Sequence, residues 1–119
     1  MKKTKILFVC TANIDRSPTA EHLYKNHSAL EVKSAGTAHY GFAELPVSKG
    51  LIMWADVILC MTEKQKRYIE YEFADIISEK IIDELDVQDD YRYMNIQLQN
   101  ILKVRIDAWL EKNLNIQSS

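Results

Sequence analysis

The sequence predicts a three-layer α/β fold in which a four-stranded parallel sheet lies between two layers of helices. Short apolar runs rich in β-branched residues alternate along the chain with stretches of helical periodicity. Such alternation calls for crossover connections, which make the strands parallel and place helices on both faces. The chain has 119 residues, of which 47% are hydrophobic and 27% charged, and this is enough for one domain with a buried core. We therefore expect residues 1–119 to form a single domain.

Each predicted element follows from its own pattern. Apolar runs bounded by polar residues predict strands at 5–10, 31–35, 56–61 and 80–85. Apolar residues three and four positions apart predict helices at 17–27, 47–54, 63–73 and about 95–114. The first helix is expected to begin with Ser17 as its N-cap and Pro18 at its first helical position.

Charge and composition exclude several classes of partner. The 15 Lys and Arg residues against 17 Asp and Glu give a net charge of −2, so the chain lacks the basic excess that nucleic-acid binding uses. No uncharged stretch reaches the roughly 18 apolar residues of a membrane span. The N-terminal apolar run meets polar residues from Asn13 onward before any cleavage site, which favours a strand over a signal peptide. Two cysteines are too few for a disulfide framework, so we expect a cytoplasmic protein with no membrane or nucleic-acid partner.

The residues that could carry out a reaction lie where the first predicted strand meets the first predicted helix. In C-T-A-N-I-D-R-S, five residues separate Cys10 from Arg16. A short loop between a strand and a helix directs backbone N–H groups and the positive helix end at one point, which makes a site for a phosphate-sized dianion. The same field stabilises a thiolate at Cys10, and the planar guanidinium of Arg16 can hold two phosphoryl oxygens. The pattern indicates attack of a thiolate on phosphorus.

The remaining cysteine and the histidines suggest no further chemistry. Cys60 lies in a predicted buried strand and is expected to pack in the core. A disulfide to Cys10 requires facing side chains, a geometry that we do not expect because Cys10 ends its strand. The three histidines, His22, His27 and His39, lack ligand spacing, so no metal site is predicted, and the chemistry needs no organic cofactor.

The run V-C-T-A-N-I-D-R-S-P-T-A-E resembles the signature of the low-molecular-weight protein tyrosine phosphatases. The likeness extends to S-A-G-T at 34–37, A-D-V-I-L-C-M at 55–61 and D-D-Y at 89–91, and thus spans most of the chain. It implies a flavodoxin-like fold in which Cys10 is the nucleophile, Arg16 the phosphate clamp and Asp89 the general acid. The implied phosphate-binding loop consists of Thr11, Ala12, Asn13, Ile14, Asp15, Arg16 and Ser17.

The resemblance also implies how this loop is supported. Ser17 would donate its hydroxyl proton to the thiolate. Asn13 and Ser34 would hydrogen-bond to each other and hold the loop. Tyr91 is either part of the pocket wall or an ordinary surface aromatic.

Three departures from the family pattern bear on the site. Only residues 38–54 separate the S-A-G-T segment from the next matched segment, fewer than family members usually have, and the sequence resembles a shortened bacterial branch. D-D-Y replaces D-P-Y, so the acid is Asp89 or Asp90, or the acidic run is a solvated loop. Asp15 adds a negative charge beside the anion site, which at about 6 Å costs ~3 kcal/mol at an effective dielectric of 20 and ~0.7 kcal/mol in water. We expect its side chain to face water.

These observations favour a phosphomonoester hydrolase that acts on phosphotyrosine or a related aryl phosphate. The substrate would be a phosphorylated protein or a small aryl phosphate. Two alternatives stay open. The first is a catalytically weak anion-binding or regulatory module, which the charge of Asp15 and the short segment would explain. The second is an arsenate reductase on the same scaffold, although that activity needs a relay of further thiols and only Cys60 is present.

Overall fold

Eight secondary-structure elements follow one another in the predicted order. The computed structural model describes residues 2–38 and 44–117. The strands are β1 (Thr4–Cys10), β2 (Leu30–Gly36), β3 (Val57–Cys60) and β4 (Ile81–Glu84). The helices are α1 (Arg16–Tyr24), α2 (Lys49–Trp54), α3 (Glu63–Glu72) and α4 (Ile96–Leu114). The strands pair in parallel in the order β2-β1-β3-β4, which confirms the predicted sheet.

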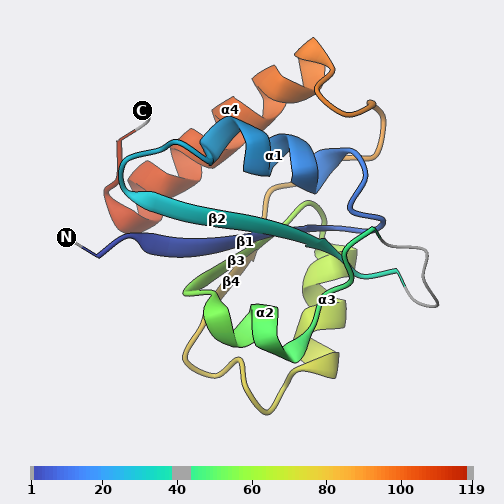
Figure 1. The fold of residues 1–119 in the computed structure, drawn as a ribbon, viewed down its shortest axis with the longest axis vertical. Coiled ribbons are helices and arrows are strands. Elements are labelled where there is room, and N and C mark those ends of the chain that lie inside the picture. Colours follow the sequence, from blue (N-terminus) through green and yellow to red (C-terminus); the bar gives the residue numbers. More distant parts are fainter. Residues whose placement is uncertain (1, 39–43, 118–119) are drawn as a thin grey trace.

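Helices α1 and α4 cover one face of the sheet, and α2 and α3 cover the other, as Figure 1 shows. Successive side chains of β1 point to opposite faces because a strand has a period of two residues. On one face, Phe8 lies in a cluster with Leu102 of α4, and α1 packs beside it. On the other face, Leu7 lies in a cluster with Ile52 of α2 and Ile69 of α3. The three-layer prediction is therefore correct.

The two cysteines lie on opposite faces of this sheet. Cys60 of β3 pairs in register with Val9 of β1, and both belong to the cluster beneath α2 and α3. Cys10 follows Val9 and belongs to the cluster beneath α1 and α4. Both thiols are free, and burial raises the pKa of the Cys60 thiol. The prediction that Cys60 packs in the core is confirmed.

Helix α1 begins two residues earlier than the N-cap pattern predicts. Its first helical residue is Arg16 and its N-cap is Asp15, so the prediction of Ser17 as N-cap is wrong. The Ser17 hydroxyl lies instead 3.0 Å from the Cys10 Sγ, in the interior. Pro18 is the third helical residue, a position where its missing N–H costs nothing because first-turn N–H groups have no intrahelical acceptor.

The far end of α1 is fixed to α4. The hydroxyl of Tyr24 donates to the Asp107 carboxylate at 2.5 Å. The pKa of Tyr24 is raised, mainly by burial and to a smaller extent by this hydrogen bond. The helix ends there, so His27 lies outside it, with its Nδ1 accepting from the Ala29 N–H at 3.0 Å.

No helix among the described residues is long and apolar enough to cross a membrane.

Candidate active site

Cys10 occupies the carboxyl end of β1, where the order of the strands reverses. Strand β1 has β2 on one side and β3 on the other, so the connections that follow β1 and β3 lead to opposite faces of the sheet. Open α/β sheets bind ligands outside the carboxyl ends of the strands at such a point. The fold therefore places the loop of residues 11–17, here called the Cys10 loop, at the position expected for a ligand.

The carbonyl groups at the start of the Cys10 loop are turned toward the segment after β2. Three loop carbonyls accept hydrogen bonds from the segment after β2: Cys10 from Thr37 at 3.0 Å, Thr11 from Ala38 at 2.9 Å and Ala12 from Glu44 at 2.9 Å. In a trans peptide the N–H points away from the carbonyl, so each following N–H is directed to the opposite side. The last of them, the Asn13 N–H, donates to the Cys10 Sγ at 3.2 Å. Asn13 has φ 56°, a left-handed conformation that asparagine tolerates better than most residues.

A chain of hydrogen bonds links the Ser17 hydroxyl to Asn13, Ser34 and Glu21. The Glu21 carboxylate accepts from Ser34 Oγ at 2.5 Å, so the Ser34 hydroxyl proton is used there. Asn13 Nδ2 then donates to Ser34 Oγ at 3.0 Å and to Ser17 Oγ at 2.9 Å. Ser17 Oγ accepts from Asn13, and its own proton has two acceptors within reach, the Cys10 Sγ at 3.0 Å and the Ala35 carbonyl at 3.4 Å. Two groups that can donate a hydrogen bond therefore lie at the sulfur, the Asn13 N–H and the Ser17 hydroxyl.

Arg16 and the loop after β4 meet at the mouth of the Cys10 loop. Arg16 is buried, and its Nη1 donates to the Val87 carbonyl at 2.9 Å. Its Nε lies 3.8 Å from Asp89 Oδ1, whose side chain is 67% exposed. Asp90 is exposed, and Tyr91 is half-buried against the cluster beneath α1 and α4. Of the two candidate acids, the structure brings Asp89 to Arg16.

Gln65 supports the Cys10 loop from α3, and the sequence analysis missed it. Its buried Nε2 donates to Thr11 Oγ1 at 2.9 Å, while its Oε1 accepts from the Thr62 N–H at 2.7 Å. The signal was present as T-x-x-Q at the start of a predicted helix, a capping-box pattern. That pattern shows that Gln65 caps α3 but not that its other end reaches a loop fifty residues earlier in the chain.

Asp15 does not simply face water, which corrects the expectation from the sequence. Its side chain is half-buried, and Oδ1 accepts a hydrogen bond from the Tyr93 N–H at 2.8 Å. Its carboxylate therefore joins the Cys10 loop to the segment that precedes α4.

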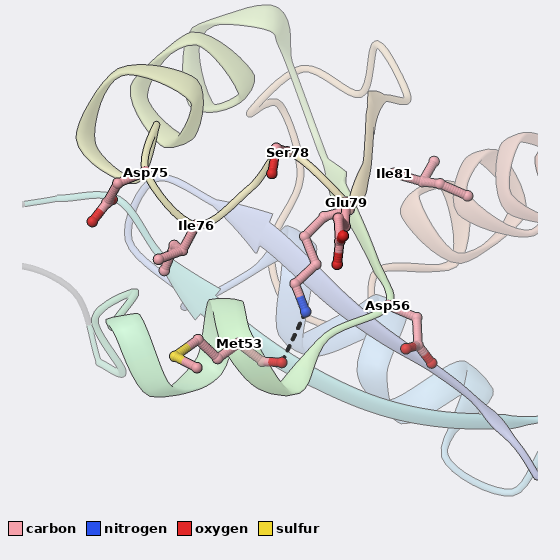
Figure 2. Close-up of a pocket in the computed structure, with 8 residues that line it drawn as sticks. Met53, Asp56, Asp75, Ile76, Ser78, Glu79 and Ile81 are labelled. Atoms are coloured by element: carbon pink, nitrogen blue, oxygen red, sulfur yellow. Dashed lines mark hydrogen bonds between the residues drawn. The ribbon is translucent and has the colours of Figure 1, made fainter.

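A separate cavity lies at the amino ends of β3 and β4, at the far end of the sheet from Cys10. It encloses about 640 Å³ and is lined by Asp56, Asp75 and Glu79, among others (Figure 2). The Nζ of Lys80 donates to the Met53 carbonyl at 2.9 Å and so caps the carboxyl end of α2. Three carboxylates would repel a phosphate dianion, so this cavity does not compete with the Cys10 loop.

Nowhere in residues 2–38 and 44–117 do three His, Cys, Asp or Glu side chains group closely enough to hold a metal ion, and His39 lies outside these residues.

Mild peroxide treatment is expected to inactivate the protein without forming a Cys10–Cys60 disulfide. The two thiols face opposite sides of the sheet, so Cys60 cannot trap a sulfenic acid at Cys10. Oxidation should proceed to the irreversible sulfinic acid, and inorganic phosphate should protect by occupying the loop. Mass spectrometry of the Cys10 peptide after oxidation measures this, with Cys60→Ala as the control that loses activity at the same rate. A Cys10–Cys60 disulfide that thiol fully reverses would contradict it.

Comparison with known proteins gives a family match for part of the sequence. The model of the family described as low molecular weight phosphotyrosine protein phosphatase matches residues 5–50, which include β1, the Cys10 loop and β2. No curated protein sequence matches the chain. The resemblance stated from the motifs is therefore confirmed for the segment that carries the Cys10 loop.

Solved structures match the fold along nearly the whole chain. The low molecular weight protein tyrosine phosphatase of Streptococcus pyogenes superposes with a TM-score of 0.73 at 16% identity, covering 93% of each chain. The corresponding phosphatase of T. tengcongensis gives 0.72 at 24% identity, covering 92% of this chain and 99% of its own. The YwlE arginine phosphatase of Geobacillus stearothermophilus gives 0.67 at 22% identity, covering 98% and 99%. The chain therefore has the fold of the low molecular weight protein tyrosine phosphatases, and its residues 5–50 carry that family's sequence pattern.

Proposed function

We propose that this protein is a cysteine-dependent phosphomonoester hydrolase that cleaves phosphotyrosine or a related aryl phosphate through a cysteinyl-phosphate intermediate. The observation that carries the proposal is that two groups able to donate a hydrogen bond lie at the Cys10 Sγ, the Asn13 N–H at 3.2 Å and the Ser17 hydroxyl at 3.0 Å. A cysteine that merely packs in a core has no use for such donors. The match of residues 5–50 to the phosphatase family model supports the same reaction.

In the first step, the Cys10 thiolate attacks phosphorus in line with the ester oxygen. The S–P bond forms as the P–O bond to the aryl group breaks, and Asp89 gives its proton to the departing phenolate. Arg16 and the N–H groups of the Cys10 loop stabilise the charge on the equatorial oxygens. The position of Asp89 supports this role, because its Oδ1 lies 3.8 Å from Arg16 Nε and the carboxyl group therefore stands next to the residue that clamps the phosphate.

In the second step, water hydrolyses the cysteinyl phosphate. Asp89, now ionised, takes a proton from the water as its oxygen attacks phosphorus and the S–P bond breaks. Inorganic phosphate leaves and Cys10 returns as the thiolate that Ser17 stabilises. Every proton and electron pair is supplied by the substrate, water or these side chains, so the proposal includes no metal or organic cofactor.

The surroundings of the Cys10 loop favour an aromatic leaving group. Ile14 in the loop is 50% exposed, and Leu45 and Tyr93, on the two segments that bond to the loop, are each 49% exposed. Each of these side chains offers apolar area close to the loop. A tyrosyl ring entering with its phosphate would bury area against them.

Two broader statements complete the proposal. Residues 1–119 act as one domain, and their substrate is a phosphorylated protein or a small phosphate ester. The location is the cytoplasm, because a free thiol nucleophile persists in a reducing compartment. Independence from nucleic acids stays a prediction from the net charge of −2.

The alternative functions have less support. An arsenate reductase would need a second thiol to attack the arsenylated cysteine, and Cys60 lies on the other face of the sheet. An anion-binding module would need the same loop but no acid. The ion pair between Arg16 and Asp89 brings a carboxyl group to that loop, which a binding module does not require.

Hydrolysis of aryl phosphates should be measurable and unaffected by EDTA, because a thiolate nucleophile and an arginine clamp leave no role for a metal. The assay is phosphate release from nitrophenyl phosphate and from a phosphotyrosine peptide, with phosphoarginine as a third substrate because YwlE shares the fold. The protein should hydrolyse the phosphotyrosine peptide faster than phosphoarginine. Loss of activity in EDTA that a divalent ion restores would overturn the mechanism, and a single turnover without phosphate release would indicate a binding module.

A further inference from the structure

The loop that carries Asp89 is attached to the Cys10 loop at both of its ends. This β4–α4 loop comprises residues 85–95, between the last strand and the last helix. At its beginning, the Val87 carbonyl accepts from Arg16 Nη1 at 2.9 Å. At its end, the Tyr93 N–H donates to Asp15 Oδ1 at 2.8 Å, and the Met94 N–H donates to Thr19 Oγ1 at 2.9 Å. The residues between these attachments include both candidate acids.

We propose that Asp15 and Thr19 are positioning residues that set the distance of the acid from the Cys10 sulfur. The inference rests on the proposed function, because it concerns where the general acid of that reaction stands. Asp15 directly precedes Arg16, so the same short stretch of backbone forms the anion site and anchors the β4–α4 loop. Thr19 Oγ1 also donates to the Asp15 carbonyl at 2.6 Å, which makes the two anchors one unit.

Leu85 and Val87, at the start of this loop, are buried in the core, whereas most of residues 88–95 are exposed. The side chain of Asp89 is 67% exposed, and Tyr93 is 49% exposed. Tyr91 makes partial contact with the core. Residues 88–95 bury so little apolar area that their conformation depends on their hydrogen bonds.

The backbone at Met94 shows that the anchor is specific. Met94 has φ 60°, in the left-handed region that a side chain with a Cβ disfavours. It is held there on both sides, because its N–H donates to Thr19 and its carbonyl accepts from Gln99 Nε2 at 2.7 Å. A strained residue persists only where its surroundings over-determine it, and strain of this kind is concentrated at functional sites.

The charge of Asp15 is separable from its hydrogen bond. An asparagine at this position can still accept from the Tyr93 N–H through its carbonyl oxygen, whereas an alanine cannot. Removing the charge also removes its repulsion of a bound phosphate, which at about 6 Å in water corresponds to ~3-fold in affinity. Asp15→Asn and Asp15→Ala therefore separate positioning from electrostatics.

The experiment compares the hydrolysis rates of aryl phosphates whose leaving phenols differ in basicity. The more basic the phenol, the more its departure depends on a general acid. Asp15→Ala and Thr19→Val should lose at least about tenfold more rate on phenyl phosphate than on nitrophenyl phosphate. Asp15→Asn and Thr19→Ser should keep the wild-type dependence on the leaving group. Asp15→Asn should also lower the inhibition constant of inorganic phosphate at least about threefold. Asp75→Asn, which removes an exposed carboxylate at the distant cavity, should not change that inhibition constant.

The outcomes separate this inference from the proposed function. An active wild type whose leaving-group dependence is unaltered in both Asp15→Ala and Thr19→Val overturns the positioning role alone. Equal loss in Asp15→Asn and Asp15→Ala also overturns it, because the effect would then belong to the charge. A wild type that binds phosphate but releases none from any ester overturns the proposed function instead. Thermal unfolding of each variant identifies any loss of fold, and the Thr19 pair provides the test if Asp15→Ala is unstable.

Discussion

Replacing Cys10 with serine is expected to abolish turnover and to leave the affinity for phosphate intact. The serine hydroxyl is far less acidic than the thiol, so the loop no longer holds an ionised nucleophile. The N–H groups that bind the phosphate belong to the backbone, and their orientation is set by carbonyl contacts with Thr37, Ala38 and Glu44, which the substitution does not touch. The loss in kcat should be at least about 10⁴-fold, the scale seen when a covalent nucleophile is removed.

Steady-state assays and calorimetric titration with phosphate or vanadate measure the two quantities separately. Cys60→Ala serves as the control, because that thiol lies on the other face of the sheet and should leave the affinity for phosphate unchanged. Residual activity of Cys10→Ser near the wild-type level would show that another group is the nucleophile. Loss of phosphate binding in the same variant would show that the sulfur, and not the loop backbone, holds the anion.

The second large effect is expected from the acid. Asp89→Asn should slow the release of a basic phenol about 10²–10⁴-fold, the usual contribution of a general acid, while an activated nitrophenol should be much less affected. Asp90→Asn is the matched variant, since it makes the same chemical change one residue away. The 3.8 Å contact between Asp89 and Arg16 is the reason for expecting the effect at Asp89.

The pair of variants allows two contrary results. If Asp90→Asn shows the leaving-group dependence and Asp89→Asn does not, the acid is Asp90. If neither variant does, the acidic run is a solvated loop, and the reaction proceeds without an acid from this segment.

The fold could be predicted because its signals are local. Each buried strand is a short apolar run, and the alternation of strands with helices leaves few arrangements other than a parallel sheet covered on both faces. Even β4, whose residues are mostly half-buried, was recognised from its apolar start at Ile81 and Ile82. The start of α1 was misplaced because Ser17 has the side chain of an N-cap, but a buried sulfur competes for its hydroxyl.

The candidate site was predictable only where its residues adjoin in the chain. Cys10 and Arg16 lie on either side of one loop, so their spacing indicates their meeting. Gln65, Thr19 and Asp15 act through side chains that reach segments 54 to 78 residues away. Nothing in the composition of a single segment encodes such a contact, which arises only when the sheet order brings α3 and the β4–α4 loop beside β1.

The position of β1 within the sheet divides the reaction between regions of unequal local stability. Strand β1 is hydrogen-bonded along both edges, whereas β4 is bonded along one. Segments at the edge of a sheet open by fraying at a lower free energy than those at its centre. The nucleophile thus stands on a segment that global unfolding releases, and the acid follows one that can open alone. Substitutions in β4 are therefore expected to disturb the placement of the acid before they disturb the strand that carries the nucleophile.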